Sequence, residues 1–217
     1  MGQTQSWEIP MLTVWGRTNS SNVKKVLWCL KELNIPYNQK DVGGPFGGLD
    51  TPEYKKMNPN STIPTLQDDQ FALWESNAIL RYLTEKYDHS HLLLARDLQE
   101  KAAADKWMDW SSANLFDHIK QMMNKIVRVP EADRDPAQAK VIYQNIEKLL
   151  KIADDALATQ DYFSGNAFGI ADIAIAPLFY PWHEIVTERP EFPHLERWYQ
   201  ALTKRPAFQE IVMLPIK

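Results

Sequence analysis

The chain has 217 residues, of which 44% are hydrophobic, and its formal net charge is -4. A chain of this size can bury the core of one or two domains. The acidic balance, with no cluster of basic residues, excludes nucleic acid and an anionic membrane surface as main partners. The single cysteine, Cys29, excludes an internal disulfide and indicates a reducing, cytoplasmic compartment.

Residues 1–10, MGQTQSWEIP, are expected to form a loose extension before Met11. They lack the cationic start and the apolar core of a signal peptide. No later apolar run is long enough to span a bilayer, so we expect no contact with a membrane.

The stretch from Gly16 to Leu33 predicts a polar loop followed by an amphipathic helix. Leu12, Val14 and Trp15 indicate a short strand before it. Apolar residues then recur at helical spacing, and charged residues lie on the opposite face. The apolar set is Val23, Val26, Leu27, Leu30 and Leu33, and the charged set is Lys24, Lys25, Lys31 and Glu32.

Asn19, Ser20, Ser21 and Asn22 lie between this strand and this helix. One of them is enough to cap the helix, since Ser and Asn are strong N-cap residues. Four consecutive hydroxyl or amide side chains exceed that need. The first turn of a helix also presents unpaired N–H groups and a positive dipole potential, which suit an anion such as a thiolate.

The next elements complete a small α/β unit. Residues 37–42 predict a second strand, parallel to the first because a helix connects them. The glycines at 43–48 do not match a phosphate-binding loop, since neither their spacing nor a following Lys-Ser or Lys-Thr pair fits. A short helix is expected from Pro52. Residues 63–66 and 71–74 predict a hairpin with a turn at Asp68 and Asp69, and a helix capped by Glu75 and Ser76 follows to Tyr87.

After residue 87 the strand signals end. We expect residues 88–98 to be a linker and residues 99–217 to form an all-helical domain, which makes the fold α/β plus all-α with a first domain at 11–87. The expected helices are one long helix containing Trp107 to Met123, then 137–157, 170–186, 195–202 and 206–212. Pro177 and Pro181 should bend or end the helix at 170–186.

Four motifs in this order carry a resemblance to a known family: SSNVKKVLW, NPNSTIP, WESNAILRYL and FSGNAFGIADIAIAP. Together they resemble the cytosolic glutathione S-transferases, in a theta-like or Nu-like bacterial form. The resemblance implies a thioredoxin-like N-terminal domain that binds glutathione as co-substrate, followed by an all-helical domain. It also implies a second-substrate pocket, which we place at Arg17, Ser112 and Phe116, and a homodimer.

Such an enzyme must favour the glutathione thiolate. The thiol has an unperturbed pKa of about 8.5, and lowering it by about two units takes roughly 2.7 kcal/mol. One hydroxyl donor plus a helix N-terminus can supply this. Alignment on VKKV puts Ser20 where theta-like members place a catalytic serine, and Asn22 where Nu-like members place a functional asparagine. A shift of one residue would bring Ser21 to the same place.

The resemblance also assigns the glutathione site. Ile63-Pro64 resembles the family's cis-proline, so the main chain of Ile63 could pair with the cysteinyl segment of glutathione as an added strand. Without the resemblance, an ordinary trans proline at an edge strand would be favoured. Ser76 would hold the γ-glutamyl carboxylate and Glu75 its ammonium, in addition to their local roles at the strand end and helix cap.

Two positions depart from the family pattern. Gly169 stands where the internal capping box has Ser or Thr, three residues before Asp172, and Thr62 stands where relatives often carry a Lys or Gln that reaches glutathione. Cys29 lies mid-helix between Trp28 and Leu30 and is expected to pack in the core. The five histidines form no metal-binding pair, so no metal is expected.

Three functions are therefore open. The first is conjugation of glutathione to a small apolar electrophile. The second is glutathione-dependent reduction of a disulfide or peroxide, which Asn22 supports. The third is a non-catalytic interaction module on the same fold, against which the polar groups at the expected thiol site argue.

Overall fold

The computed structural model describes residues 11–216. The N-terminal part of the chain forms a four-stranded sheet in the order β2-β1-β3-β4. The strands are β1 (Leu12–Trp15), β2 (Tyr37–Lys40), β3 (Thr65–Asp68) and β4 (Phe71–Trp74). β1 and β2 are parallel, with Leu12 opposite Tyr37, and β3 is antiparallel to both β1 and β4. The predicted crossover and hairpin are confirmed.

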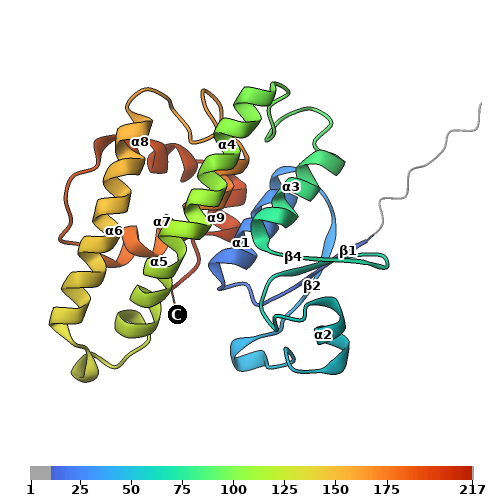
Figure 1. The fold of residues 1–217 in the computed structure, drawn as a ribbon, viewed down its shortest axis with the longest axis horizontal. Coiled ribbons are helices and arrows are strands. Elements are labelled where there is room, and N and C mark those ends of the chain that lie inside the picture. Colours follow the sequence, from blue (N-terminus) through green and yellow to red (C-terminus); the bar gives the residue numbers. More distant parts are fainter. Residues whose placement is uncertain (1–10, 217) are drawn as a thin grey trace, which may run out of the picture.

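Three helices accompany the sheet: α1 (Ser21–Glu32), α2 (Pro52–Met57) and α3 (Ser76–Tyr87). α1 and α3 lie between the sheet and the rest of the molecule, whereas α2 lies beyond the sheet from α3 (Figure 1). A short 3-10 turn, Gly44–Phe46, precedes α2. This arrangement is the expected thioredoxin-like domain.

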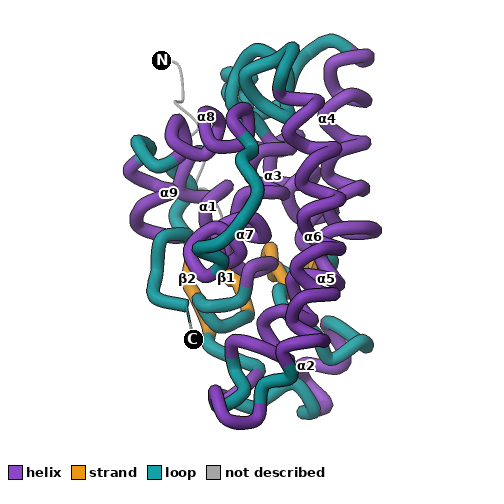
Figure 2. Tube along the Cα trace, turned by 90° about the vertical axis from the view of Figure 1, so that its left-hand side faces the viewer, coloured by secondary structure: helices purple, strands orange, loops and turns teal. Residues whose placement is uncertain are grey.

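The second half is helical, as Figure 2 shows from the side. Its helices are α4 (Leu98–Trp110), α5 (Phe116–Met122), α6 (Pro136–Leu157), α7 (Ile170–Ile185), α8 (Pro193–Leu202) and α9 (Pro206–Ile211). The π-helical turns Ser111–Leu115 and Met123–Val127 flank α5. α7 runs through Pro177 and Pro181, so the expectation that they could end this helix is wrong.

α1 is enclosed on nearly all sides, because it packs against α3, α7 and α9 as well as facing the sheet. Lys24 and Lys25, which the periodicity placed opposite the apolar face, are therefore only 6% and 1% exposed. The apolar positions were correctly predicted, and Val23, Val26, Leu27 and Leu30 are fully buried. The helical domain covers Lys24, whose Nζ reaches the carbonyl oxygen of Val212 and lies 5.2 Å from the ring centroid of Tyr180.

Polar contacts fix α1 to the C-terminal helices. Arg205 donates from Nε and one terminal nitrogen to the two carboxylate oxygens of Glu32, at 2.9 and 2.7 Å, and its guanidinium lies 3.7 Å from the ring centroid of Phe168. Lys24 Nζ donates to the carbonyl oxygen of Val212 at 2.8 Å. The two halves of the chain thus meet along one helix.

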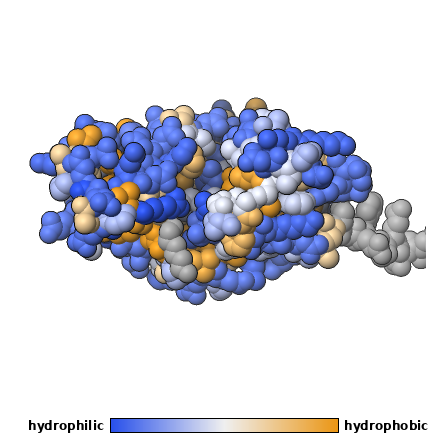
Figure 3. Space-filling model, turned by 90° about the horizontal axis from the view of Figure 1, so that it is seen from below, coloured by the Kyte–Doolittle hydropathy of each residue, from blue (hydrophilic) through white to orange (hydrophobic). Residues whose placement is uncertain are grey.

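Within residues 11–216, no helix has the length and apolarity needed to cross a membrane. Seen from below, this face is largely hydrophilic with several smaller hydrophobic areas (Figure 3). The expected extension at residues 1–10 lies outside the described residues.

Candidate functional site

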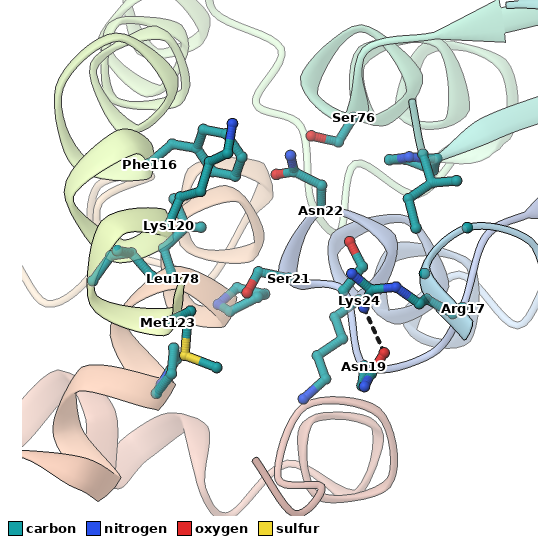
Figure 4. Close-up of a pocket in the computed structure, with 18 of the residues that line it drawn as sticks. Arg17, Asn19, Ser21, Asn22, Lys24, Ser76, Phe116, Lys120, Met123 and Leu178 are labelled. Atoms are coloured by element: carbon teal, nitrogen blue, oxygen red, sulfur yellow. Dashed lines mark hydrogen bonds between the residues drawn. The ribbon is translucent and has the colours of Figure 1, made fainter. Parts of the chain in front are cut away.

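A cavity of about 540 Å³ lies where the two halves meet. One wall consists of the start of α1, the loop before β3 and the start of α3. The other consists of α5, α7 and the segment at 215–216. Figure 4 shows Asn22 and Ser76 on the first side and Phe116, Lys120, Met123 and Leu178 on the other.

The N-terminus of α1 opens into this cavity. Asn19, Ser20, Ser21 and Asn22 all line it. Ser20 occupies the N-cap position, but its hydroxyl makes no capping hydrogen bond. The ordinary capping role therefore does not use this side chain, which remains available to a ligand beside the positive end of the helix.

The loop before β3 forms the next part of the wall. The Ile63-Pro64 peptide bond is cis, as predicted. The carbonyl oxygen of Thr62 accepts from the hydroxyl of Tyr54 at 2.6 Å and from the side-chain amide of Asn58 at 2.9 Å. Ile63 and Pro64 both line the cavity, and no hydrogen bond joins the main chain of Ile63 to the other described residues. An extended peptide could pair there.

Glu75 and Ser76 lie at the start of α3 and both line the cavity. Glu75 occupies the N-cap position and Ser76 the first helical position, and the Glu75 side chain makes no capping bond. The expectation that these side chains cap α3 is thus corrected. Glu75 has φ of 70°, a left-handed conformation that is costly for a residue with a Cβ and that often marks a functional site.

The helical wall is mainly apolar near α5. Phe116, Ile119, Met123 and Leu178 line the cavity, and so does Arg17 from the other side. Ser112 does not line it, and its hydroxyl accepts from the amide of Asn77 at 3.1 Å. Ser112, which we expected in the second-substrate pocket, is exposed in the π-helical turn Ser111–Leu115.

Basic side chains predominate in the lining of the cavity, which the sequence did not predict. Of the described residues that line it, Arg17, Lys24, Lys120 and Arg128 are basic and only Glu75 is acidic. Burial lowers the pKa of Arg17, and the nearby positive charge of Arg128 lowers it further. No signal in the sequence identified this cluster, because its members come from α1, α5 and two loops that meet only in the fold.

Two other candidate chemistries find little support. Cys29 is fully buried, and burial raises the pKa of its thiol well above the ordinary value, so a reactive thiolate is disfavoured. Across residues 11–216, no group of three or more His, Cys, Asp and Glu side chains is placed to hold a metal ion.

Comparison with known proteins agrees with this geometry. Residues 19–86 match the family model "Glutathione S-transferase, N-terminal domain", and residues 118–206 match "Glutathione S-transferase, C-terminal domain". Glutathione S-transferase GstB of Escherichia coli K12 is 41% identical over 208 residues, which is 95% of this chain and 100% of the relative. Glutathione S-transferase 1 of Schizosaccharomyces pombe is 30% identical and covers 80% of this chain and 75% of its own.

A solved structure matches the whole fold. The theta class glutathione S-transferase of Xanthomonas axonopodis pv. citri, with glutathione bound, superposes with a TM-score of 0.91 at 45% identity. The match covers 96% of this chain and 100% of the other.

Proposed function

The chain belongs to the glutathione S-transferase family, and from this membership we propose that Ser20 activates the glutathione thiol. The protein is a glutathione transferase, with glutathione as its co-substrate. The observation that carries the proposal is that Ser20 lines the cavity at the N-cap of α1 and that its hydroxyl does not cap the helix. A donor in this place can stabilise a thiolate, assisted by the helix dipole and by Asn22.

Glutathione fits along the sheet side of the cavity in this proposal. Its cysteinyl segment pairs with the main chain of Ile63, and its γ-glutamyl carboxylate binds at Ser76, the first residue of α3. Glu75 accepts from the γ-glutamyl ammonium. The thiolate then faces an electrophile whose apolar body contacts Phe116 and Met123. Attack by sulfur forms the new bond while the leaving group departs with its electron pair.

The test is the pH dependence of turnover in Ser20→Ala. Loss of a hydrogen bond to a charged group costs about 1.5 to 3 kcal/mol, so the acidic limb should move up by about one to two pH units. Thiolate absorbance of bound glutathione should titrate with the same shift. Ser21→Ala is the matched control and should leave the limb in place. An unchanged limb in Ser20→Ala removes Ser20 from the mechanism, and a shift only in Asn22→Ala transfers the role.

Reduction of a disulfide or peroxide by glutathione is the second candidate, because the amide of Asn22 also lines the cavity and lies toward Ser76 (Figure 4). Parallel assays with an aryl halide and a small disulfide, each with glutathione, separate the two activities. The non-catalytic module is not favoured, since the curated relatives are named as transferases.

We also propose a cytoplasmic homodimer. Support for association comes from Phe71 and Trp74 on β4, an edge strand, which are 49% and 37% exposed. Large apolar side chains exposed on an edge strand favour a protein contact. Light scattering after size-exclusion chromatography should give twice the monomer mass. The Phe71→Glu variant should give a lower mass, closer to that of the monomer. A monomer at micromolar concentration would contradict the proposal.

A further inference from the structure

We propose that the second substrate carries an anionic group, such as a carboxylate, which binds at Lys120 with Arg17 and Arg128 nearby. This inference rests on the proposed function and adds the chemical class of the electrophile. It starts from the uneven charge of the cavity, where four basic side chains and one acidic side chain face the same space. The chain as a whole has a net charge of -4, so its overall charge does not account for this excess.

Arg17 is held in place toward the cavity. One terminal nitrogen donates to the side chain of Asn19 at 2.6 Å, and the guanidinium lies across Gly44. A Cβ on Gly44 would come within 2.9 Å of Arg17 Nε, so the glycine makes room for this side chain. Nε itself is buried with no hydrogen-bond partner among the described residues, and no described carboxylate pairs with this guanidinium.

A second guanidinium, that of Arg128, lies near Arg17. The positive charge of Arg128 is close enough to lower the pKa of Arg17. Arg128 lines the cavity and donates to the side chain of Asn124 at 2.8 Å. Two nearby guanidinium groups disfavour each other, and an anion between them reverses the sign of that interaction.

Lys120 brings a further positive charge from the helical wall. It lies one turn after Phe116 on α5, and Figure 4 shows both side chains on the same side of the cavity. Its ammonium has no hydrogen bond or ion pair with the other described residues. A substrate with an aromatic body against Phe116 would therefore bring an attached carboxylate close to Lys120.

In the proposed pose, glutathione does not place a carboxylate at Lys120 on the α5 wall of the cavity. Its γ-glutamyl end lies at Glu75 and Ser76, across from α5, and its cysteinyl segment follows Ile63. Arg17 lies on the sheet side, where the glycyl carboxylate could also approach it. Lys120 projects from the opposite wall, which belongs to the second substrate.

The test compares two matched electrophiles, 4-chloro-3-nitrobenzoate and 4-chloro-3-nitrobenzamide, which share the leaving group and the nitro group. In both, the glutathione sulfur bonds to the ring carbon, chloride leaves with its electron pair, and the thiol proton passes to solvent. We expect Lys120→Gln to lower kcat/KM for the carboxylate about tenfold, through an increase in KM. The same variant should change kcat/KM for the amide less than about twofold.

Lys125→Gln is the matched control, because Lys125 is exposed in the turn after α5 and does not line the cavity. This variant removes the same charge and should leave kcat/KM for both substrates unchanged. Arg128→Gln should act in the same direction as Lys120→Gln, and Arg128→Lys should restore part of the loss. A second pair, dithiodiglycolate and 2-hydroxyethyl disulfide, shows whether the anion is carried by a disulfide instead of an aryl halide.

Three results would overturn the inference. They are equal losses on the carboxylate and the amide, no loss on either, and a rise in KM for glutathione that accounts for the whole effect. The last would assign the anion to glutathione itself. Titration calorimetry with the two S-aryl glutathione products needs no turnover. If neither electrophile reacts but the carboxylate product still binds more tightly through Lys120, the conjugation reaction fails and the anion site stands.

Discussion

Ser164 lies so close to Gly169 that a Cβ on the glycine would be 2.8 Å from both Cβ and Oγ of the serine. The sequence shows half a capping box here, because Gly169 offers no side-chain acceptor. In the fold, Asp172 accepts from the N–H of Gly169 at 2.9 Å, and the Ser164 hydroxyl accepts from the N–H of Ala171 at 3.0 Å. A residue from the preceding turn thus supplies the missing cap of α7.

Replacing Ser164 by Ala should therefore destabilise the protein by about 1 kcal/mol, as loss of a helix cap does. Gly169→Ser, which would restore the familiar motif, should destabilise it as well, since its Cβ would lie 2.6 Å from the carbonyl oxygen of Leu93. Urea unfolding of both variants measures the two effects. A gain in stability for Gly169→Ser would show that the local backbone can shift to accept the side chain.

Glu75→Gln and Ser76→Ala should weaken glutathione binding more than electrophile binding. Loss of one charge-assisted contact costs roughly 1.5 to 3 kcal/mol, or about one to two decades in affinity. Titration calorimetry with glutathione, accompanied by thermal melts, measures this. Glu53→Gln, an exposed acid on α2 away from the cavity, is the control. Unchanged affinity in both folded variants would show that the γ-glutamyl end binds elsewhere.

Cys29→Ala should keep its activity, because the thiol is fully buried in the core and its pKa is raised by burial. The expected cost is of the order of 1 kcal/mol of unfolding free energy, from the small cavity left behind. The native parent should also react slowly with a chromogenic disulfide reagent until it is denatured. Complete inactivation of a folded Cys29→Ala protein would reopen a cysteine mechanism.

Lys25 should make stability depend on pH in the alkaline range. Burial lowers its pKa from the ordinary 10.5 to about 7, although Glu75 opposes the shift. Between these values the unfolded chain binds more protons than the folded one, so the free energy of unfolding contributed by this group rises with pH.

Lys25→Met removes this contribution, and it should stabilise the protein most near pH 7, by at least about 1 kcal/mol, with a smaller gain near pH 10. Thermal melts across this range measure the gain, and Lys125→Met, an exposed lysine, is the control. Destabilisation of Lys25→Met at neutral pH would mean that the ammonium is charged and paired with Glu75.

The elements could be predicted because their signals are local. Apolar residues at helical spacing marked α1 and α6, and the turn at Asp68 and Asp69 marked the hairpin. The burial of Lys24 could not be predicted from the sequence, because it depends on α7, which lies about 150 residues further along the chain.

The site was predictable where it is contiguous in sequence, as at Ser20 to Asn22. It was not predictable where separate segments converge. Lys120 and Arg17 share the cavity only because the fold brings α5 opposite the start of α1, and Ser112, one turn before Phe116 in the sequence, does not line it.

The bidentate contact between Glu32 and Arg205 has a consequence for how the protein unfolds. α1 presents ligand-binding groups at its first turn and is joined to α9 through Glu32 in its last turn. The segments at 19–86 and 118–206 therefore share one helix as a common support and should melt in a single cooperative transition. Glutathione bound at the first turn of α1 should slow amide hydrogen exchange as far away as α9.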